Sequence, residues 1–302
     1  MTKNSVLKGV LLVGIGATSY GMLATFVKIA YDQGFTTPEV TLSQFVYGII
    51  GMLLINAFQK AKKGKEVLKP SIKNIFYLIL AGTSLGFTSV FYYLTLKYIP
   101  VSIAIILLMQ TVWMGVVFEM FLEKKTPSVQ KTIAVITVLL GTVLATNLYE
   151  STFQLSWIGI FWGLMSAVSF SATMITANRV ALGISSTQRS LYMLIGGAIV
   201  SFLYAFAAQT TPFNFDVFLK WGILLALFGT VIPPLLFNIG FPLTGIGLGS
   251  IVSALELPVS VVLAYFILNE KVNGMQWLGI ILIILAVVIM NIDYKRFRMP
   301  KT

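Results

Sequence analysis

Long apolar segments alternate with short polar segments along the whole chain. Runs such as 158–170 (IGIFWGLMSAVSF) and 277–290 (WLGIILIILAVVIM) are apolar on nearly every face, whereas the strands of a membrane barrel alternate apolar and polar positions. The pattern predicts an all-α polytopic membrane protein with ten transmembrane helices. The expected spans are 6–31, 38–58, 73–94, 99–121, 128–147, 156–178, 188–209, 219–241, 245–268 and 274–292.

Short matches recur at a near-constant separation and predict an internal duplication. Gly82-Thr83 recurs at Gly229-Thr230 and Glu123-Lys124 at Glu270-Lys271, both 147 residues apart, and 16–20 (GATSY) resembles 166–170 (SAVSF) at a separation of 150. The separation of 147 also places Met109-Gln110 opposite Glu256-Leu257. We therefore expect two five-helix units, residues 1–150 and 151–302. Because five is odd, the second unit enters the membrane from the opposite face. Such inverted repeats are typical of carriers whose substrate site lies near the midplane.

The ninth predicted span carries one ionisable side chain near its middle, Glu256. A carboxylate at that depth costs about 2.5 to 3.5 kcal/mol on insertion scales, so we expect it to face a cavity lined by protein. Pro258 lacks a backbone donor and is expected to leave the carbonyl near Ala254 without its helical partner. We interpret Glu256 as a functional-site residue. The alternative is a structural hydrogen-bonding group between packed helices.

Other polar and cationic side chains lie at similar depth or near span ends. Gln110 lies beside the position that matches Glu256, and Trp113 follows it on the same helical face. Lys28 and Arg179, near the far ends of the first and sixth spans, either reach the headgroups or guide an anionic substrate group at opposite mouths of one cavity. The remaining candidates, each also explained by an interhelical hydrogen bond, are Tyr20, Tyr92, Ser169, Thr173 and Asn238.

Several features are assigned to structure rather than to a site. Glu119 lies close to the inner surface, where it reaches water. Glycine pairs four residues apart, at 82/86, 159/163 and 245/249, are expected to let helices approach closely. Pro233 and Pro234 are expected to break or kink the eighth span.

Composition supports a membrane location. Of the 302 residues, 57% are hydrophobic and 10% charged. The mean hydropathy of +0.91 is higher than that of water-soluble globular proteins. The net charge of +11 does not indicate a nucleic-acid partner, because the basic residues cluster in one loop and at the end of the chain. These clusters are Lys60, Lys62, Lys63, Lys65, Lys69 and Lys73, then Lys295, Arg296, Arg298 and Lys301.

The positive-inside rule predicts the orientation. With both termini in the cytoplasm, most basic residues, Arg189 among them, belong to inner segments. The outer side then carries Lys28, Lys97, Lys220 and Lys271. We expect a multi-pass protein of the plasma membrane, a bacterial inner membrane, with both termini cytoplasmic.

Cysteine and histidine are both absent. This excludes a disulfide framework, a thiolate nucleophile, a Ser-His relay and a zinc site built on Cys and His. Neither a cofactor, a metal nor enzymatic activity is expected. The expected partners are a small-molecule substrate and the lipid bilayer, with protons as a candidate coupling ion, and the expected assembly is a monomer or homodimer.

Three segments carry a resemblance to a known family. They are 19–30 (SYGMLATFVKIA), 92–113 (YYLTLKYIPVSIAIILLMQTVW), and the Glu256-Leu257-Pro258 stretch with 266–272 (FILNEKV). The chain resembles the drug/metabolite transporter superfamily in its ten-helix EamA branch. The resemblance implies a carrier that exports small metabolites, with a cavity lined by the first, third, fourth, sixth, eighth and ninth helices. The fourth span has Gln110-Thr111-Val112 where many members have a proline, so we expect it to bend less than the ninth.

The combined prediction is a secondary transporter, an exporter or exchanger, that moves an amino acid or amphiphilic metabolite by alternating access. Glu256 is expected to be its proton-sensitive or amine-binding group. The alternatives are a non-transporting membrane scaffold and a membrane-embedded enzyme.

Overall fold

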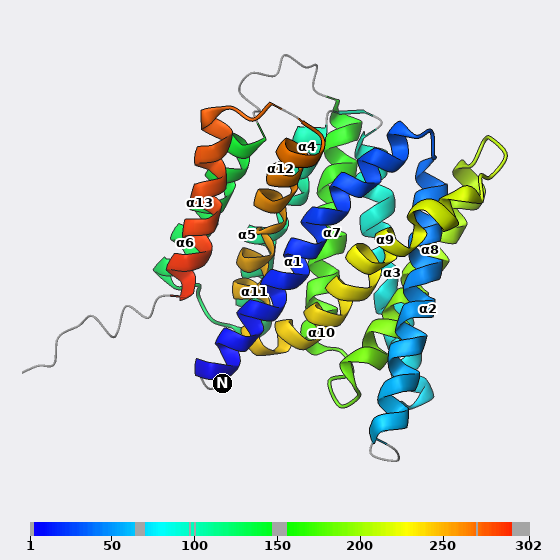
Figure 1. The fold of residues 1–302 in the computed structure, drawn as a ribbon. Helices are drawn as coiled ribbons and strands as arrows, with labels where there is room; N and C mark the ends of the chain where they lie inside the picture. Colours follow the sequence, from blue (N-terminus) through cyan, green and yellow to red (C-terminus); the bar gives the residue numbers. More distant parts are fainter. Residues whose placement is uncertain are drawn as a thin grey trace, which may run out of the picture.

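In the computed structural model, the described residues are 3–63, 70–96, 98–99, 101–146, 156–269 and 271–291 (Figure 1). Throughout these residues the chain forms helices and short connections, without a strand. Eight helical segments within them are long and apolar enough to cross a membrane, and two apolar helices are shorter. The predicted all-helical membrane class is confirmed.

The predicted spans correspond to helical segments within a few residues, with differences in the fourth, eighth and ninth. In chain order the helices are α1 (Lys3–Asp32), α2 (Thr37–Lys63), α3 (Ile72–Leu96), α4 (Val101–Leu108), α5 (Thr111–Glu123), α6 (Val129–Ala145), α7 (Trp157–Arg179), α8 (Ser186–Ala208), α9 (Ile223–Ala226), α10 (Ile232–Thr244), α11 (Ile246–Ser253), α12 (Glu256–Ile267) and α13 (Gly274–Asn291). The shorter pair is α6 and α13.

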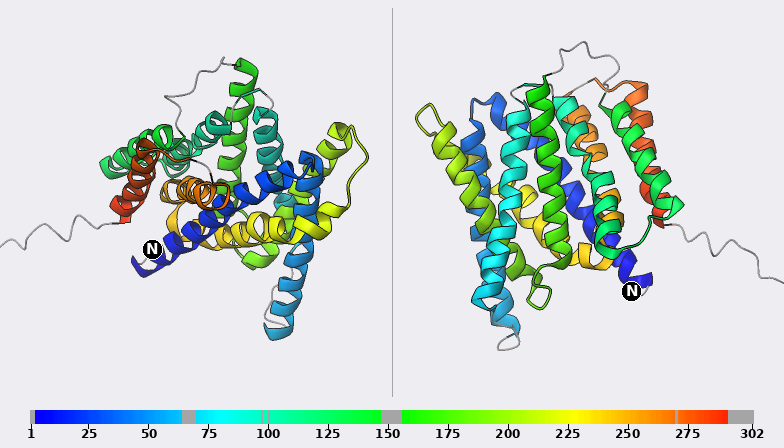
Figure 2. Two further views of the ribbon diagram at one scale, coloured as in Figure 1. Left: turned by 45° about the horizontal axis from the view of Figure 1, so that its top comes forward. Right: turned by 180° about the vertical axis from the view of Figure 1, so that it is seen from behind.

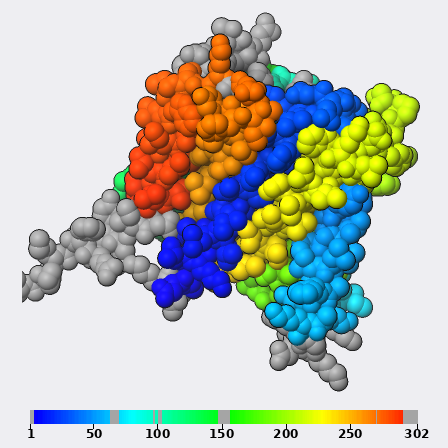
Figure 3. Space-filling model, viewed as in Figure 1, coloured from blue at the N-terminus to red at the C-terminus, as the bar shows by residue number. Residues whose placement is uncertain are grey.

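The bundle has two ends, which we name after Figure 1. α1 begins at the lower end, where α13 finishes, and α7 begins at the upper end. On one face α1 lies between α10 and α12 (Figure 3). On the opposite face α3 packs against α7 and α8 (Figure 2), while α6 pairs with α13 and α5 with α11.

Glycines allow the closest of these contacts. A Cβ at Gly86 of α3 would lie 2.6 Å from the carbonyl oxygen of Gly197 in α8, so the two backbones touch. A Cβ at Gly163 of α7 would lie 2.8 Å from the Leu107 Cβ of α4. Gly245 differs, because its φ of 77° places it in the turn before α11 rather than in a packed helix.

The fourth predicted span is interrupted at Met109 and Gln110, between α4 and α5. The Gln110 N–H turns back to the Leu107 carbonyl at 3.1 Å, which leaves the Ile106 carbonyl without its usual backbone donor. The Gln110 side-chain Nε2 donates to Ile106 instead, at 2.9 Å. The span is interrupted although it lacks a proline, because a glutamine side chain satisfies the carbonyl that the interruption frees. The expectation that it bends less than the ninth span stays a prediction.

The ninth predicted span is interrupted in the same manner, between α11 and α12. The expected unpaired carbonyl at Ala254 is absent, because it accepts the Leu257 N–H at 3.2 Å in a tightened turn. The helices that follow the two interruptions start 145 residues apart, α5 at Thr111 and α12 at Glu256. This separation is two residues shorter than the 147 of the predicted match between Met109 and Glu256.

The eighth predicted span is a continuous helical path with irregular geometry. Two π-helical segments, Phe218–Gly222 and Leu227–Val231, flank α9 and lead directly into α10. Pro233 and Pro234 stand in the first turn of α10. A proline cannot donate to the carbonyl four residues before it, and these carbonyls belong to the second π-helical segment. The predicted break or kink therefore takes the form of this wider turn.

Arg189, in the first turn of α8, does not contribute to the charge of the surface. It is 2% exposed, and its guanidinium donates to the carbonyl oxygens of Ala177 at 2.6 Å, Asn238 at 2.8 Å, Val180 at 2.9 Å and Thr176 at 3.2 Å. Three of these acceptors lie at the end of α7, where helical carbonyls lack backbone donors. Its prediction as one of the inner basic residues stays untested, but its charge is used inside the fold.

The lysine-rich loop is described in part. Lys60, Lys62 and Lys73 have exposed side chains at the lower end. The basic and acidic residues Lys65, Lys69, Lys97, Glu270, Lys295, Arg296, Arg298 and Lys301 lie outside the described residues.

Candidate functional site

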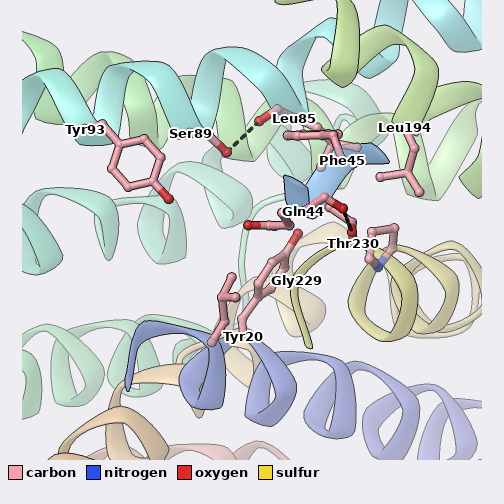
Figure 4. A pocket seen from close by; sticks show the side chains of 11 residues that line it. Tyr20, Gln44, Phe45, Leu85, Ser89, Tyr93, Leu194, Gly229 and Thr230 are labelled. Carbon is pink, nitrogen blue, oxygen red and sulfur yellow. Dashed lines mark hydrogen bonds between the residues drawn. The ribbon is translucent and has the colours of Figure 1, made fainter. Parts of the chain in front are cut away.

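A cavity of about 70 Å³ lies among α1, α2, α3, α8 and the eighth span (Figure 4). Its polar lining consists of Tyr20, Gln44, Ser89, Tyr93 and Thr230, and the remaining lining residues are apolar or glycine. A cavity of this size with a polar lining can hold water or one functional group of a metabolite.

Two hydroxyl groups of this lining donate hydrogen bonds to backbone carbonyls. Ser89 Oγ donates to the Leu85 carbonyl at 3.3 Å, and Thr230 Oγ1 donates to the Gln44 carbonyl at 3.0 Å. Thr230 thereby joins the eighth span to α2. Both hydroxyls keep acceptor capacity toward the cavity.

The Gln44 carboxamide, in contrast to these hydroxyls, has no hydrogen bond among the described residues. The side chain is 6% exposed and reaches between Tyr20 and Tyr93 in Figure 4. A Cβ at Gly229 would lie 2.9 Å from the Gln44 Cδ, so the glycine provides room for the amide. The sequence reasoning missed Gln44, although a glutamine inside an apolar span was the available signal.

Glu256 begins α12 and faces the interior of the bundle. It is half-buried, and its carboxylate is close enough to the hydroxyls of Tyr20 in α1 and Tyr92 in α3 to act on them electrostatically. α1 reaches α12 here because Gly21 lacks a side chain: a Cβ at Gly21 would lie 2.9 Å from the Val259 Cβ. Glu256, Tyr20 and Tyr92, three of the predicted site residues, therefore lie together.

Glu256 differs from the other carboxylates that the structure describes. Four of these are hydrogen-bonded or ion-paired: Glu39 to backbone N–H groups, Glu119 to Lys131, Glu123 to Arg179 and Asp216 to Lys220. Asp32 is exposed at the end of α1. Within the described part of the chain, Glu256 is the one carboxylate withdrawn from the surface without a hydrogen bond or ion pair.

Gln110 and Trp113 lie together, and their side chains are hydrogen-bonded to each other rather than open to a ligand. Trp113 Nε1 donates to Gln110 Oε1 at 2.8 Å, while Gln110 Nε2 serves the Ile106 carbonyl. The shared helical face is as expected, yet neither residue lines the cavity. Gln110 therefore stabilises the interruption of its own span.

Two other predicted residues, Thr173 and Asn238, form hydrogen bonds between helices. Thr173 Oγ1 is 2.7 Å from Ser84 Oγ and joins α7 to α3. Asn238 Nδ2 donates to Ser190 Oγ at 3.0 Å and joins α10 to α8. The hydrogen bonds of Thr173 and Asn238 correspond to the interhelical alternative. Ser169 is 9% exposed, and its backbone carbonyl accepts from Thr173 within α7.

The two cationic candidates lie at opposite ends of the bundle. Lys28 is exposed in the upper part of α1, and Arg179 ends α7 at the lower end. Arg179 Nη2 is 3.9 Å from Glu123 Oε1, a surface pair of the kind that contributes little to stability.

A second cavity, of about 210 Å³, opens at the lower end between α5 and α6. Glu119 forms an ion pair with Lys131 at its wall. The Glu119 carboxylate also lies against Gly245 and Gly247 at the start of α11, where a helix N-terminus favours a negative charge. This placement agrees with the structural assignment of Glu119.

Comparison with known proteins places the chain in a family. The profile of the EamA-like transporter family matches residues 7–147 and 157–292. The chain belongs to the EamA-like transporter family. The predicted resemblance is confirmed, and at the level of this family the protein is a membrane transporter.

Two individual proteins are similar over nearly the whole length of this EamA family member. A Salmonella typhimurium (strain LT2) protein, the uncharacterized inner membrane transporter YicL, is 24% identical over 298 residues, 97% of this chain and 98% of that one. A protein crystal structure with 16% sequence identity covers 92% of this chain and 97% of its own, with a TM-score of 0.74. That likeness shows the fold alone.

Proposed function

We propose that this EamA family protein is a secondary active transporter of small organic metabolites that carry an amine or another cationic group. Amino acids and amphiphilic amines are the candidate substrates. The observation that carries the proposal is Glu256, a carboxylate inside the bundle without a cation or donor among the described residues. A substrate ammonium would supply that missing partner.

The surroundings of Glu256 suit a cation. The hydroxyls of Tyr20 and Tyr92 are within electrostatic range of the carboxylate, and tyrosine rings can attract ammonium groups. Tyr20 also packs against Phe237, with ring centroids 5.7 Å apart, which fixes its position. A carboxylate framed by tyrosines favours an organic cation over a hydrated inorganic ion.

The proposed mechanism is alternating access between two inverted five-helix units, 1–150 and 151–302, which give ten spans. Support comes from equivalent contacts between the two units. The third span of the first unit (α3) contacts the first helix of the second unit (α7), just as the third span of the second unit (α10) contacts α1. Likewise the fourth span of the first unit (α4 and α5) contacts α7, just as α12 of the second unit contacts α1. The family profile also matches each unit once. In such carriers the substrate site lies where the repeats meet.

The interrupted spans are the proposed moving parts. α5 and α11 touch where Ser250 Oγ donates to the Val112 carbonyl at 3.1 Å, close to both interruptions. A Cβ at Gly115 would lie 2.5 Å from the Ser250 Cβ, so the two helices cross without space between them. Rotation at the interruptions would open the Glu256 region to one end and close the other.

We place the lower end in the cytoplasm, with both termini inside a bacterial inner membrane. The exposed Lys60, Lys62 and Lys73 at the lower end support this orientation. The name of the Salmonella relative agrees with an inner membrane location.

A ligand screen tests the function. Purified protein is heated with amino acids, nucleosides and amphiphilic amines, and a ligand that binds the folded state raises the midpoint of unfolding. We expect amine-bearing compounds to raise it for the wild type and for the control Glu123→Gln, whose exposed side chain lies at the lower end. Glu256→Gln is expected to lose the response. An equal response of Glu256→Gln would remove Glu256 from the proposed site.

A further inference from the structure

The second group of interest is the Gln44 carboxamide in the cavity of about 70 Å³. The side chain is more than nine-tenths buried, points into the cavity, and has nothing hydrogen-bonded to its carboxamide among the described residues. A carboxamide that loses water without gaining a partner costs free energy, so an unpaired one facing a cavity indicates a ligand or water there.

The cavity is polar but uncharged. Its polar lining consists of an amide and hydroxyls, and neither lysine nor arginine belongs to the lining. The buried guanidinium of Arg189 already donates to four carbonyls, and the exposed Lys28 lies in the upper part of α1. A carboxylate entering this cavity would lose its hydration without meeting a cation.

We infer that this cavity is a second, neutral subsite, in which Gln44 recognises an uncharged amide of the same substrate whose ammonium group binds at Glu256. The inference rests on the proposed function. A carboxamide has an acceptor oxygen and two N–H donors, so Gln44 can both donate to the carbonyl of a substrate amide and accept from its N–H. The substrate class is therefore an amine that carries a separate amide, in preference to a zwitterion.

Tyr20 connects the two groups. It lines the neutral cavity and is also within electrostatic range of Glu256, which does not line the cavity. Because Glu256 lies outside the cavity lining, we expect the ligand to carry an apolar spacer between its amine and its amide that passes Tyr20. The α-amino amide of an amino acid, with both groups on neighbouring carbons, has no such spacer.

Three probes with the same chain length separate these contributions. They are 6-aminohexanamide, 6-aminohexanoate and hexylamine, whose binding to the purified protein is measured by calorimetry. We expect 6-aminohexanamide to bind about tenfold more tightly than hexylamine, the effect of satisfying a buried hydrogen-bonding group. We expect 6-aminohexanoate to bind no more tightly than hexylamine.

The deciding variant is Gln44→Met, which keeps the length of the side chain and removes its polar atoms. It is expected to lower the affinity for 6-aminohexanamide about tenfold, to that of hexylamine, and to leave hexylamine binding unchanged. Gln59→Met on the same helix is the matched control, because Gln59 lies outside the cavity and accepts from Thr187 Oγ1 at 2.6 Å. This control should retain the preference for the amide.

The outcomes separate the two proposals. If hexylamine binding depends on Glu256 but the amide has no advantage, or Gln44→Met keeps that advantage, the neutral subsite is wrong and the proposed function stands. If hexylamine binds Glu256→Gln as well as the wild type, the proposed function fails. Absence of binding by all three probes overturns both.

Discussion

Glu39 and Glu256 are both carboxylates inside predicted spans, and their surroundings differ. Glu39 is 2% exposed and accepts from the backbone N–H groups of Thr36 and Asn214, each at 2.7 Å, and from Gln209 Nε2 at 3.1 Å. Glu256 has no such donor among the described residues. A carboxylate whose donors are supplied by the fold stabilises the fold, whereas one without them remains open to a ligand.

This contrast predicts opposite effects on stability. Glu39→Gln, which replaces an acceptor oxygen by a donor, is expected to lower the free energy of unfolding by about 1 to 3 kcal/mol, because a backbone N–H is left unpaired. Glu256→Gln is expected to leave that free energy unchanged or raise it, since it removes a half-buried charge that has no partner among the described residues. Thermal unfolding of ligand-free protein in detergent measures both. A comparable loss for Glu256→Gln would favour the structural alternative.

For single residues, the sequence indicated the depth of a side chain within its span but not its hydrogen-bond partners. Tyr20 and Tyr92, selected like Glu256 by their depth, lie within electrostatic range of Glu256, and the role of these three residues as a site stays a prediction. Thr173 and Asn238 had the same signal, but the Thr173 hydroxyl and the Asn238 amide nitrogen are hydrogen-bonded to residues far away in the sequence. The sequence does not show which polar group is already paired, and this is why the unpaired Gln44 was missed.

Among the helical elements, the interrupted fourth span shows how a break forms without proline. The Gln110 side chain replaces the backbone donor of the Ile106 carbonyl. The sequence predicted the midplane position of Gln110 but not the interruption, because a glutamine carries no fixed backbone constraint comparable to that of Pro258. The matching interruption in the ninth span emerges at a separation of 145 residues, two fewer than the sequence matches suggested.

Gln110→Leu tests this account of the fourth span. The change removes the donor to the Ile106 carbonyl and is expected to lower the free energy of unfolding by about 1 to 3 kcal/mol. Trp113→Phe is the matched control, because it removes the bond to Gln110 Oε1 while leaving the Ile106 carbonyl satisfied. A smaller loss is expected there in thermal unfolding. Equal losses in the two variants would contradict the assigned role of Nε2.

For the whole molecule, the lack of cysteine makes the proposed orientation directly testable. Thr126 is exposed between α5 and α6 at the lower end, and Thr210 is exposed after α8 at the upper end. In intact cells, a membrane-impermeant maleimide is expected to label Thr210→Cys, and to label Thr126→Cys only after permeabilisation. The reverse pattern would place the lower end outside.

The central claim is that Glu256 holds the amine of the substrate during transport. Counterflow in proteoliposomes tests it most directly: uptake of a labelled amine found in the ligand screen is driven by the unlabelled compound inside. We expect counterflow by the wild type and Glu123→Gln, weakening in acid as protons compete for the carboxylate, and none by Glu256→Gln. Counterflow by Glu256→Gln at the wild-type rate, with the same dependence on pH, would contradict the claim.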